Sequence, residues 1–321
     1  MDEYKQILKK LTCTPAVSGY EWELGIAQVI QQCIGKPGKK IGENLVYQFG
    51  SGKTVLFLSA HMDEVGFFVT NIFSDTATIV PIGDINVKDV VDKYLVFLNS
   101  NKKITTKSIR TVNDFSMLRI SAKNKLKVGM VGTFSKQFVE KGNKIIATSL
   151  DNKVGCLVLI EIIKKLMKAK TDYSIYCCFS ACEEVGTNGL LTAVRQINPS
   201  ICIDVDSAYA KPLDSQTSNW SIPKLGKGLA IQLQGTNFIV ASTLRRKLEN
   251  ICLKNDIQYQ YEIPSSNSGG TNASSLQNAG YSVAQINIPV RSQHTAKSEA
   301  SLNDIKSTIQ LLETLVFIPS A

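Results

Sequence analysis

Apolar positions in the first part of the chain follow a helical spacing and then a strand spacing. From Tyr4 to Leu11 the apolar residues recur three or four positions apart, which predicts an amphipathic helix. A second such helix is expected over about residues 21–33, and the runs NLVYQFG and TVLFLSAHMD then indicate two strands. Helices and strands in alternation predict a mostly parallel sheet.

The pattern changes between about residues 70 and 146. Short β-type runs separated by polar turns replace the alternation, and no convincing helix lies among them. These runs are TATIVPIG, YLVFLN, SMLRIS and GMVGTF. We therefore predict a small β domain, a barrel or a sandwich, inserted into the first domain.

The alternation returns after residue 147. The expected elements are helices over about 153–168, 190–196, 242–253 and 303–317, and strands at SIYCCFSAC, ICIDVD, LAIQLQG and YSVAQINIP. The predicted fold class is α/β, a mostly parallel mixed sheet flanked by helices. Residues 1–69 and 147–321 form its main domain, and residues 70–146 form a barrel-like insertion.

Composition narrows the class of protein further. The 321 residues are 44% hydrophobic, and no apolar run approaches the roughly 18 residues of a membrane span. The N-terminus lacks the regions of a signal peptide, so we expect a cytoplasmic protein without a membrane partner. Eight cysteines lie mostly in apolar runs and form no C-x-x-C pair, which favours buried, reduced thiols.

The formal charge of +9 raises the question of a polyanionic partner. Residues 71–144 hold 13 Lys and Arg against 6 Asp and Glu, so +7 of the charge lies there. The basic residues are interleaved with apolar and β-branched runs, not with stacking aromatics. A solvated sheet face is therefore favoured over a nucleic-acid surface. A polyanion-binding module with a structural metal site remains the alternative from another class.

The chain has two histidines, and each lies at a predicted strand end. His61 and Asp63 follow the apolar run VLFL, and His294 lies just beyond the strand YSVAQINIP. Sites in open α/β sheets are built at the carboxyl ends of strands. A lone histidine there is more often structural. Whether these histidines bind a metal therefore has to be judged from the acidic residues at the other strand ends.

Acidic residues mark three further positions of this kind. Asp151 opens a helix, where it could also be an N-cap, and the adjacent Glu183 and Glu184 follow a buried strand. Asp204 and Asp206 stand two apart in ICIDVDSA, so they share one side of a strand. Together with the histidines, they predict a metal site. Imidazoles and carboxylates without thiolates suit zinc, cobalt or manganese, and two such ions could activate a bridging water.

The ordered motifs of the chain resemble a known family. They run VSGYE, AHMDEVGF, VPIG, TSLDNKVG, EEVGTNG, IDVDSA, KLGKG, GGTNA and IPVRSQH. Over nearly its full length the chain resembles the TET-type dinuclear metal aminopeptidases. That family includes glutamyl, leucyl and deblocking aminopeptidases and members once labelled endoglucanases.

The resemblance implies a particular set of ligands. His61 and Asp204 hold one metal, Glu184 and His294 hold the other, and Asp151 bridges them. Two divalent ions are implied, zinc first, with cobalt or manganese as alternatives. The family also implies a cis peptide bond after Asp151.

Further roles follow from the same resemblance. Glu183 is the general base, and Asp63 holds the far nitrogen of His61. Arg291, Gly269 and Gly270 help to shape the substrate pocket. The implied activity is the hydrolysis of the N-terminal residue from peptides, in at least a homodimer whose insertion carries the subunit contact and rims the active site.

The sequence departs from the family pattern at Asn272, where an aspartate is expected, and at Ser292, where an aromatic residue is usual. Neither is an implied ligand, so the departures concern specificity. A related two-metal amidohydrolase on acylated amino acids, or a carboxypeptidase, is the alternative enzyme. The order of AHMDEVGF, the insertion and EEVG favours the aminopeptidase. The apolar runs YLVFLN or GMVGTF are the expected buried part of the dimer contact.

Overall fold

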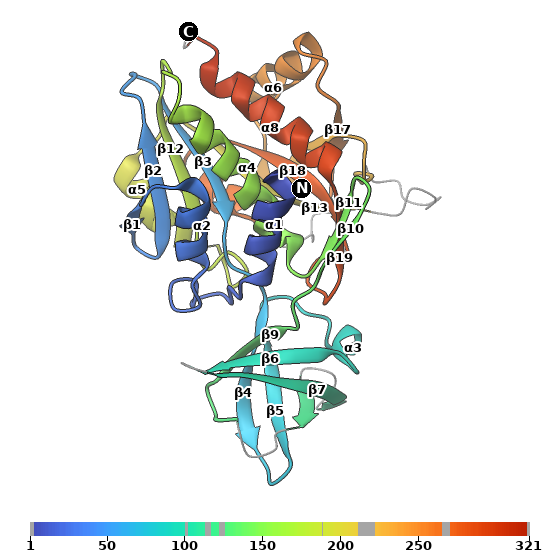
Figure 1. The fold of residues 1–321 in the computed structure, drawn as a ribbon. Helices are drawn as coiled ribbons and strands as arrows, with labels where there is room; N and C mark the ends of the chain where they lie inside the picture. Colours follow the sequence, from blue (N-terminus) through green and yellow to red (C-terminus); the bar gives the residue numbers. More distant parts are fainter. Residues whose placement is uncertain are drawn as a thin grey trace.

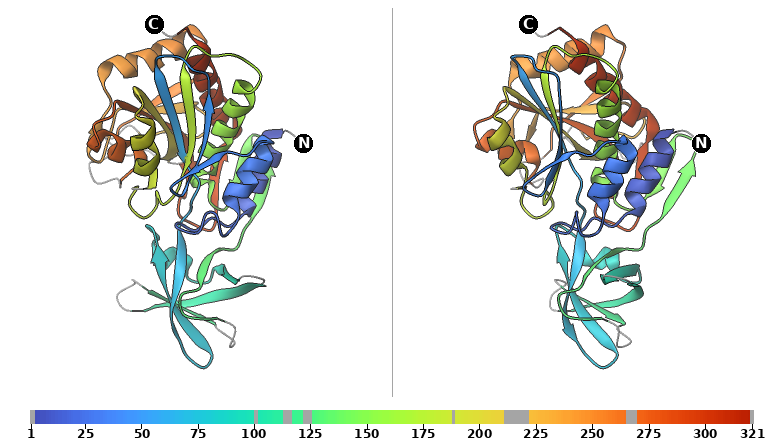
Figure 2. Two further views of the ribbon diagram at one scale, coloured as in Figure 1. Left: turned by 90° about the vertical axis from the view of Figure 1, so that its left-hand side faces the viewer. Right: turned by 60° about the vertical axis from the view of Figure 1, so that its left-hand side comes forward.

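The computed structural model describes residues 3–99, 102–112, 117–121, 126–187, 189–210, 222–264 and 270–319. It has a larger α/β body and a smaller β-barrel that extends from one end of it (Figures 1 and 2). The predicted fold class is confirmed. None of the helices among these residues combines the length and apolar character needed to cross a membrane.

An eleven-stranded mixed sheet forms the centre of the body. In spatial order its strands are β1 (Lys39–Ile41), β2 (Asn44–Phe49), β12 (Ser174–Ser180), β3 (Val55–His61), β13 (Ile201–Tyr209), β18 (Val283–Arg291), β19 (Ser298–Ser301), β11 (Lys144–Ala147) and β10 (Phe138–Lys141), with β14 (Leu229–Gln232) and β17 (Tyr259–Glu262) off this path. The four central strands β12, β3, β13 and β18 run parallel, so their carboxyl ends meet at one edge.

Helices cover both faces of this sheet (Figures 1 and 2). The helices are α1 (Glu3–Cys13), α2 (Ile26–Ile34), α4 (Leu150–Leu166), α5 (Gly189–Ile197), α6 (Ser242–Lys254), α7 (Asn272–Asn278) and α8 (Leu302–Phe317). Helix α4 packs on β3 and β13 and is itself covered by α1, α2 and α8, so nearly all of its side chains are buried. Helices α5 and α7 lie on the opposite face. A small hairpin, β15 (Gln234–Gly235) and β16 (Phe238–Ile239), adjoins α7.

The insertion is a closed barrel with its own hydrophobic core. Its strands are β4 (Gly66–Ile72), β5 (Thr76–Ile82), β8 (Met117–Ser121), β7 (Lys102–Val112), β6 (Tyr94–Asn99) and β9 (Val131–Phe134), and a short helix, α3 (Val87–Val90), follows β5. The barrel strands thus begin and end earlier than the expected boundaries of 70 and 146. The chain between them and α4 forms β10 and β11, and β11 pairs with β19 of the main sheet.

Two sequence expectations differ from the structure for identifiable reasons. The second helix begins at Ile26 and not near residue 21, because Gly25 has a left-handed conformation with φ 94°. In the run YLVFLN, Leu95 and Phe97 are buried in the barrel core, as is Phe134 of GMVGTF. These side chains are therefore not available for the subunit contact that the sequence predicts for them.

Candidate metal centre

The predicted site residues gather where the carboxyl ends of the parallel strands meet. His61 is the last residue of β3 and lies opposite Ser180 of β12, so Glu183, three residues beyond Ser180, comes next to it. Asp151 stands at the start of α4. Each strand end brings its polar residue to the same edge, as the parallel order requires.

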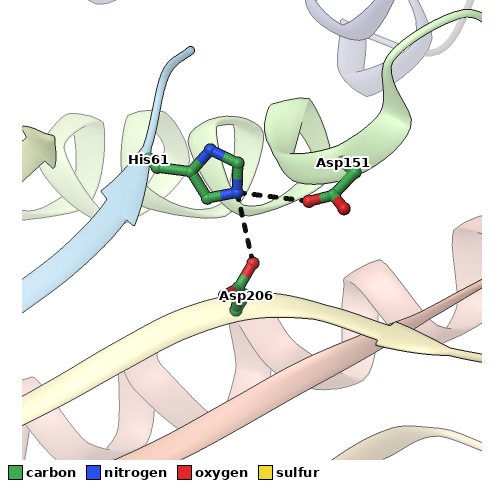
Figure 3. Close-up of side chains that lie close together, drawn as sticks. All are labelled: His61, Asp151 and Asp206. Carbon is green, nitrogen blue, oxygen red and sulfur yellow. Dashed lines mark hydrogen bonds and ion pairs between the residues drawn. The ribbon is translucent and has the colours of Figure 1, made fainter. Parts of the chain in front are cut away.

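One cluster forms around His61. Its Nε2 lies 3.2 Å from Asp151 Oδ1 and 3.4 Å from Asp206 Oδ1, as Figure 3 shows. These three side chains can each direct one ligand atom to a common point. His61 and Asp206 are buried, and Asp151 is nearly so.

A second cluster forms around His294. Its Nε2 lies 3.3 Å from Asp151 Oδ2 and 3.1 Å from Glu184 Oε2, and these three residues form the other group able to hold a metal ion. Asp151 belongs to both clusters and presents a different oxygen to each histidine. The peptide bond between Asp151 and Asn152 is cis, as the resemblance implies.

Asp204, which the resemblance implies as a ligand, lies outside both candidate metal groups. It pairs with Ser59 across β13 and β3, and its Oδ1 accepts a 2.6 Å hydrogen bond from Ser59 Oγ. Asp206 lies two residues closer to the carboxyl edge on the same side of β13, and it reaches His61. Strand register, which the sequence pattern does not show, determines which of the two aspartates lies near His61.

Asp63 contacts the ring of His61 and the backbone N–H groups of both glutamates. Its Oδ1 lies 3.4 Å from His61 Nδ1 and accepts a 3.1 Å bond from the Glu183 N–H. Its Oδ2 accepts from the Glu184 N–H at 3.1 Å and from Ser18 Oγ at 2.6 Å. This geometry fits the predicted role of orienting the imidazole. The contribution of Ser18 was missed, although it lies in the VSGYE motif.

A buried ammonium group supports the same loop. Lys153 is fully buried, and its Nζ donates to the carbonyls of Met62 at 2.5 Å and Asp63 at 3.0 Å. The neighbouring Asn152 donates from Nδ2 to the Val205 carbonyl at 2.8 Å. Sequence reasoning missed both residues, because their position directly after Asp151 does not show what they contact.

The carboxylates around the two histidines shift the pKa values of the site residues. Burial opposes protonation of His294, but Glu184 and Asp151 outweigh it and raise its pKa to about 12. Burial also opposes protonation of His61, and Glu183 with the nearby aspartates raises its pKa well above the usual value. Burial raises the pKa of Glu183 and of Glu184.

The residues fit divalent metal ions. A cation would offset the negative charge that otherwise favours protonated imidazoles. Oε1 of Glu184 is buried without a hydrogen-bond partner, and all ligand atoms are imidazole nitrogens or carboxylate oxygens, as in catalytic zinc, cobalt or manganese sites.

A cavity of about 340 Å³ opens onto both clusters. Of the two glycines expected at the substrate pocket, Gly270 lines this cavity and Gly269 lies outside the described residues. Arg291 is not among the lining residues and pairs with Glu299 Oε2 of β19 at 3.2 Å. Asn272 is buried and donates to Ser180 Oγ at 3.0 Å.

Comparisons with known proteins agree with this geometry. Residues 43–113 and 114–311 match the M42 glutamyl aminopeptidase family. A protein of Acetivibrio thermocellus named "Putative aminopeptidase" is 31% identical over 323 residues, which cover 95% of this chain and 96% of that protein. The "Lysyl aminopeptidase" of Pyrococcus furiosus is 27% identical, with 97% and 96% covered.

A solved structure shares the whole fold. The Pyrococcus horikoshii TET1 peptidase, described as able to assemble into a tetrahedron or a large octahedral shell, is 25% identical with a TM-score of 0.86, and the match covers 98% of this chain and 99% of that one. The fold and the two clusters define a metal-dependent peptidase. The chain belongs to the M42 glutamyl aminopeptidase family, the TET aminopeptidases, and is a metallo-aminopeptidase. The predicted resemblance and enzyme class are confirmed.

Proposed function

We propose that the protein removes the N-terminal residue from peptides with two divalent metal ions, zinc first and cobalt or manganese as alternatives. His61 and Asp206 would hold one ion, Glu184 and His294 the other, and Asp151 would bridge them. The observation that carries this assignment is Asp151 itself, whose two oxygens each face a different histidine. Asp206 replaces the expected Asp204 in the ligand set.

When bound, the two ions supply a water of lowered pKa and positive charge for the developing oxyanion. We assign proton transfer to Glu183, whose Oε2 lies 4.0 Å from His61 Nε2 and which belongs to neither candidate metal group. Its burial raises its pKa, so it can take a proton from the attacking water and return it to the leaving amine. Asp63 would keep the His61 ring oriented.

We also propose that the barrel carries a subunit contact in at least a homodimer. The barrel projects from the body (Figure 1), and the large apolar side chains exposed on its described part are Ile72, Phe73, Tyr94, Ile109 and Val128. These side chains replace the buried ones of YLVFLN and GMVGTF as the candidate contact. A cytoplasmic location is proposed as well, since all eight cysteines are free thiols, as expected in a reducing compartment.

Adjacent glutamates provide a matched test of the mechanism. Glu183→Gln should keep its metal and lose about 10²–10⁴ in turnover of an aminoacyl anilide. Glu184→Gln should instead weaken metal binding, because it removes a ligand charge. Metal content and kcat are measured on both variants. Equal metal loss in the two variants would contradict the division of roles.

A substrate panel tests the reaction class. The metal-loaded protein should hydrolyse aminoacyl anilides, lose that activity on chelation, and recover it when zinc, cobalt or manganese is restored. N-acyl amino acids serve as the comparison substrates. Faster hydrolysis of the acylated compounds would favour the related amidohydrolases instead.

A further inference from the structure

The barrel contributes one charged residue to the wall of the metal cavity. Asp84 lies between β5 and α3 and lines the cavity together with the metal cluster. Its side chain is exposed, and it belongs to neither group of candidate metal ligands. The proposed mechanism gives it no role.

The preceding glycine explains how the barrel reaches this position. Gly83 has φ +80°, a conformation that side chains disfavour. A Cβ atom there would lie 2.8 Å from Val65 Cγ1 and 3.2 Å from the carbonyl oxygen of Glu184. Only glycine lets the backbone pass so close to the end of β12. The residue that follows, Asp84, therefore lies at the cavity beside Glu184.

The charge of Asp84 has no counterpart in the cavity wall. Among the described residues it forms no hydrogen bond and no ion pair, and no lysine or arginine lines the cavity. Apart from the metal clusters, Glu183 and Asp84, the described wall consists of glycines and neutral polar residues. These are Gly186, Thr187, Ser207, Gly270, Thr271 and Gln293. Two divalent ions would offset the ligand carboxylates but would leave Asp84 without a cationic partner among the described lining residues.

This wall discriminates between classes of side chain. No aliphatic or aromatic residue is among the described lining residues, so an aliphatic or aromatic group would contact only the carbon atoms of polar side chains and of the backbone, and would gain less on leaving water than in an apolar pocket. An acidic group would be repelled by Asp84. A cationic group would form a charge-assisted hydrogen bond, which strengthens as the bound peptide displaces water.

We propose that the enzyme prefers peptides with a lysine or arginine at the N-terminus, and that Asp84 determines this specificity. The inference rests on the proposed aminopeptidase function. It adds the substrate class, and it assigns the barrel a direct part in substrate selection.

The test compares two substrates that differ by one ammonium group. Lysyl and norleucyl anilides share a four-carbon side chain, so the ratio of their kcat/KM values isolates the contribution of the charge. In the wild type we expect a ratio of about ten or more, the size of one hydrogen bond to a charged group. Asp84→Asn should lower that ratio about tenfold. Asp84→Lys should lower it further and raise the relative rate for a glutamyl anilide.

The matched control is the same Asp→Asn substitution at a position of the barrel away from the cavity. Asp75 lies in the β4–β5 turn of the same barrel, is exposed and does not line the cavity. Asp75→Asn should leave the ratio unchanged. The wild-type ratio should also fall as salt is added, since the contact lies at an exposed rim.

The outcomes separate the two levels of the proposal. A wild-type ratio near one, or a ratio that survives Asp84→Asn, would overturn the specificity while leaving an aminopeptidase. Failure to hydrolyse any aminoacyl anilide would refute the proposed function. In that case calorimetry with lysinamide and norleucinamide still tests Asp84, because equal affinities would overturn its preference for a cation.

Discussion

Strand β13 carries two aspartates, Asp204 and Asp206, and substituting each of them separately by asparagine tests which one binds metal. Asp206→Asn and Asp204→Asn make the same chemical change two residues apart on one face of the strand. Asp206 Oδ1 lies 3.4 Å from His61 Nε2. Asp204 Oδ1 accepts from Ser59 Oγ at 2.6 Å and faces Asn272 Nδ2 at 3.5 Å.

The structure predicts very different magnitudes for the two variants. Asp206→Asn removes a charged ligand oxygen from a group of only three ligands. Loss of a residue that merely supports a ligand costs about 10–100-fold in affinity, so loss of the ligand should cost about 100-fold or more. Asp204→Asn keeps an acceptor oxygen for Ser59 and should change the affinity only about threefold or less.

The assay is zinc titration of the metal-free protein in competition with a chelator of known affinity. Thermal unfolding of the metal-free variants checks that each remains folded, so that a lost site is not mistaken for a lost fold. The reasoning is refuted if Asp204→Asn loses zinc while Asp206→Asn binds like the wild type. That outcome would restore the original assignment of Asp204.

Three further predictions concern stability and assembly. Lys136→Met should lower the free energy of unfolding by about 3–5 kcal/mol, because it leaves the buried Glu64 carboxylate without the ammonium that contacts both its oxygens at 2.5 Å. Urea unfolding should show that adding Glu64→Gln recovers much of this loss, and strict additivity would contradict the pairing. Burial raises the pKa of Asp304 to about 7, above its unfolded value of 3.8. The folded state then holds the proton more tightly, so stability relative to Asp304→Asn should fall by about 1 kcal/mol per pH unit as pH rises from 5 to 7; a pH-independent difference would disprove this. Light scattering should show at least a dimer that Tyr94→Lys weakens, and a monomeric wild type at micromolar concentration would refute the assembly.

The sequence alone determined most of the regular elements of the body. The closing helix is expected at about 303–317 and observed as Leu302–Phe317, and the run SIYCCFSAC contains β12. Such elements are predictable because each buries a continuous stripe or an unbroken apolar run, a local property of the chain. For the same reason, the local sequence pattern predicts that His61, His294 and the paired glutamates lie at the ends of strands.

The tertiary structure decided what depends on register and on contacts between distant segments. Strand β7, KKITTKSIRTV, is rich in polar residues, so its apolar pattern does not predict a strand. It forms a strand in the barrel because it pairs with β6 on one side and with β8 on the other. The proposal of Asp206 in place of Asp204 as a ligand rests on the alignment of β13 with β3, which brings Asp206 near His61. Asp84 reaches the metal cavity because Gly83 packs against Glu184, a contact between residues 101 positions apart that no local spacing reveals.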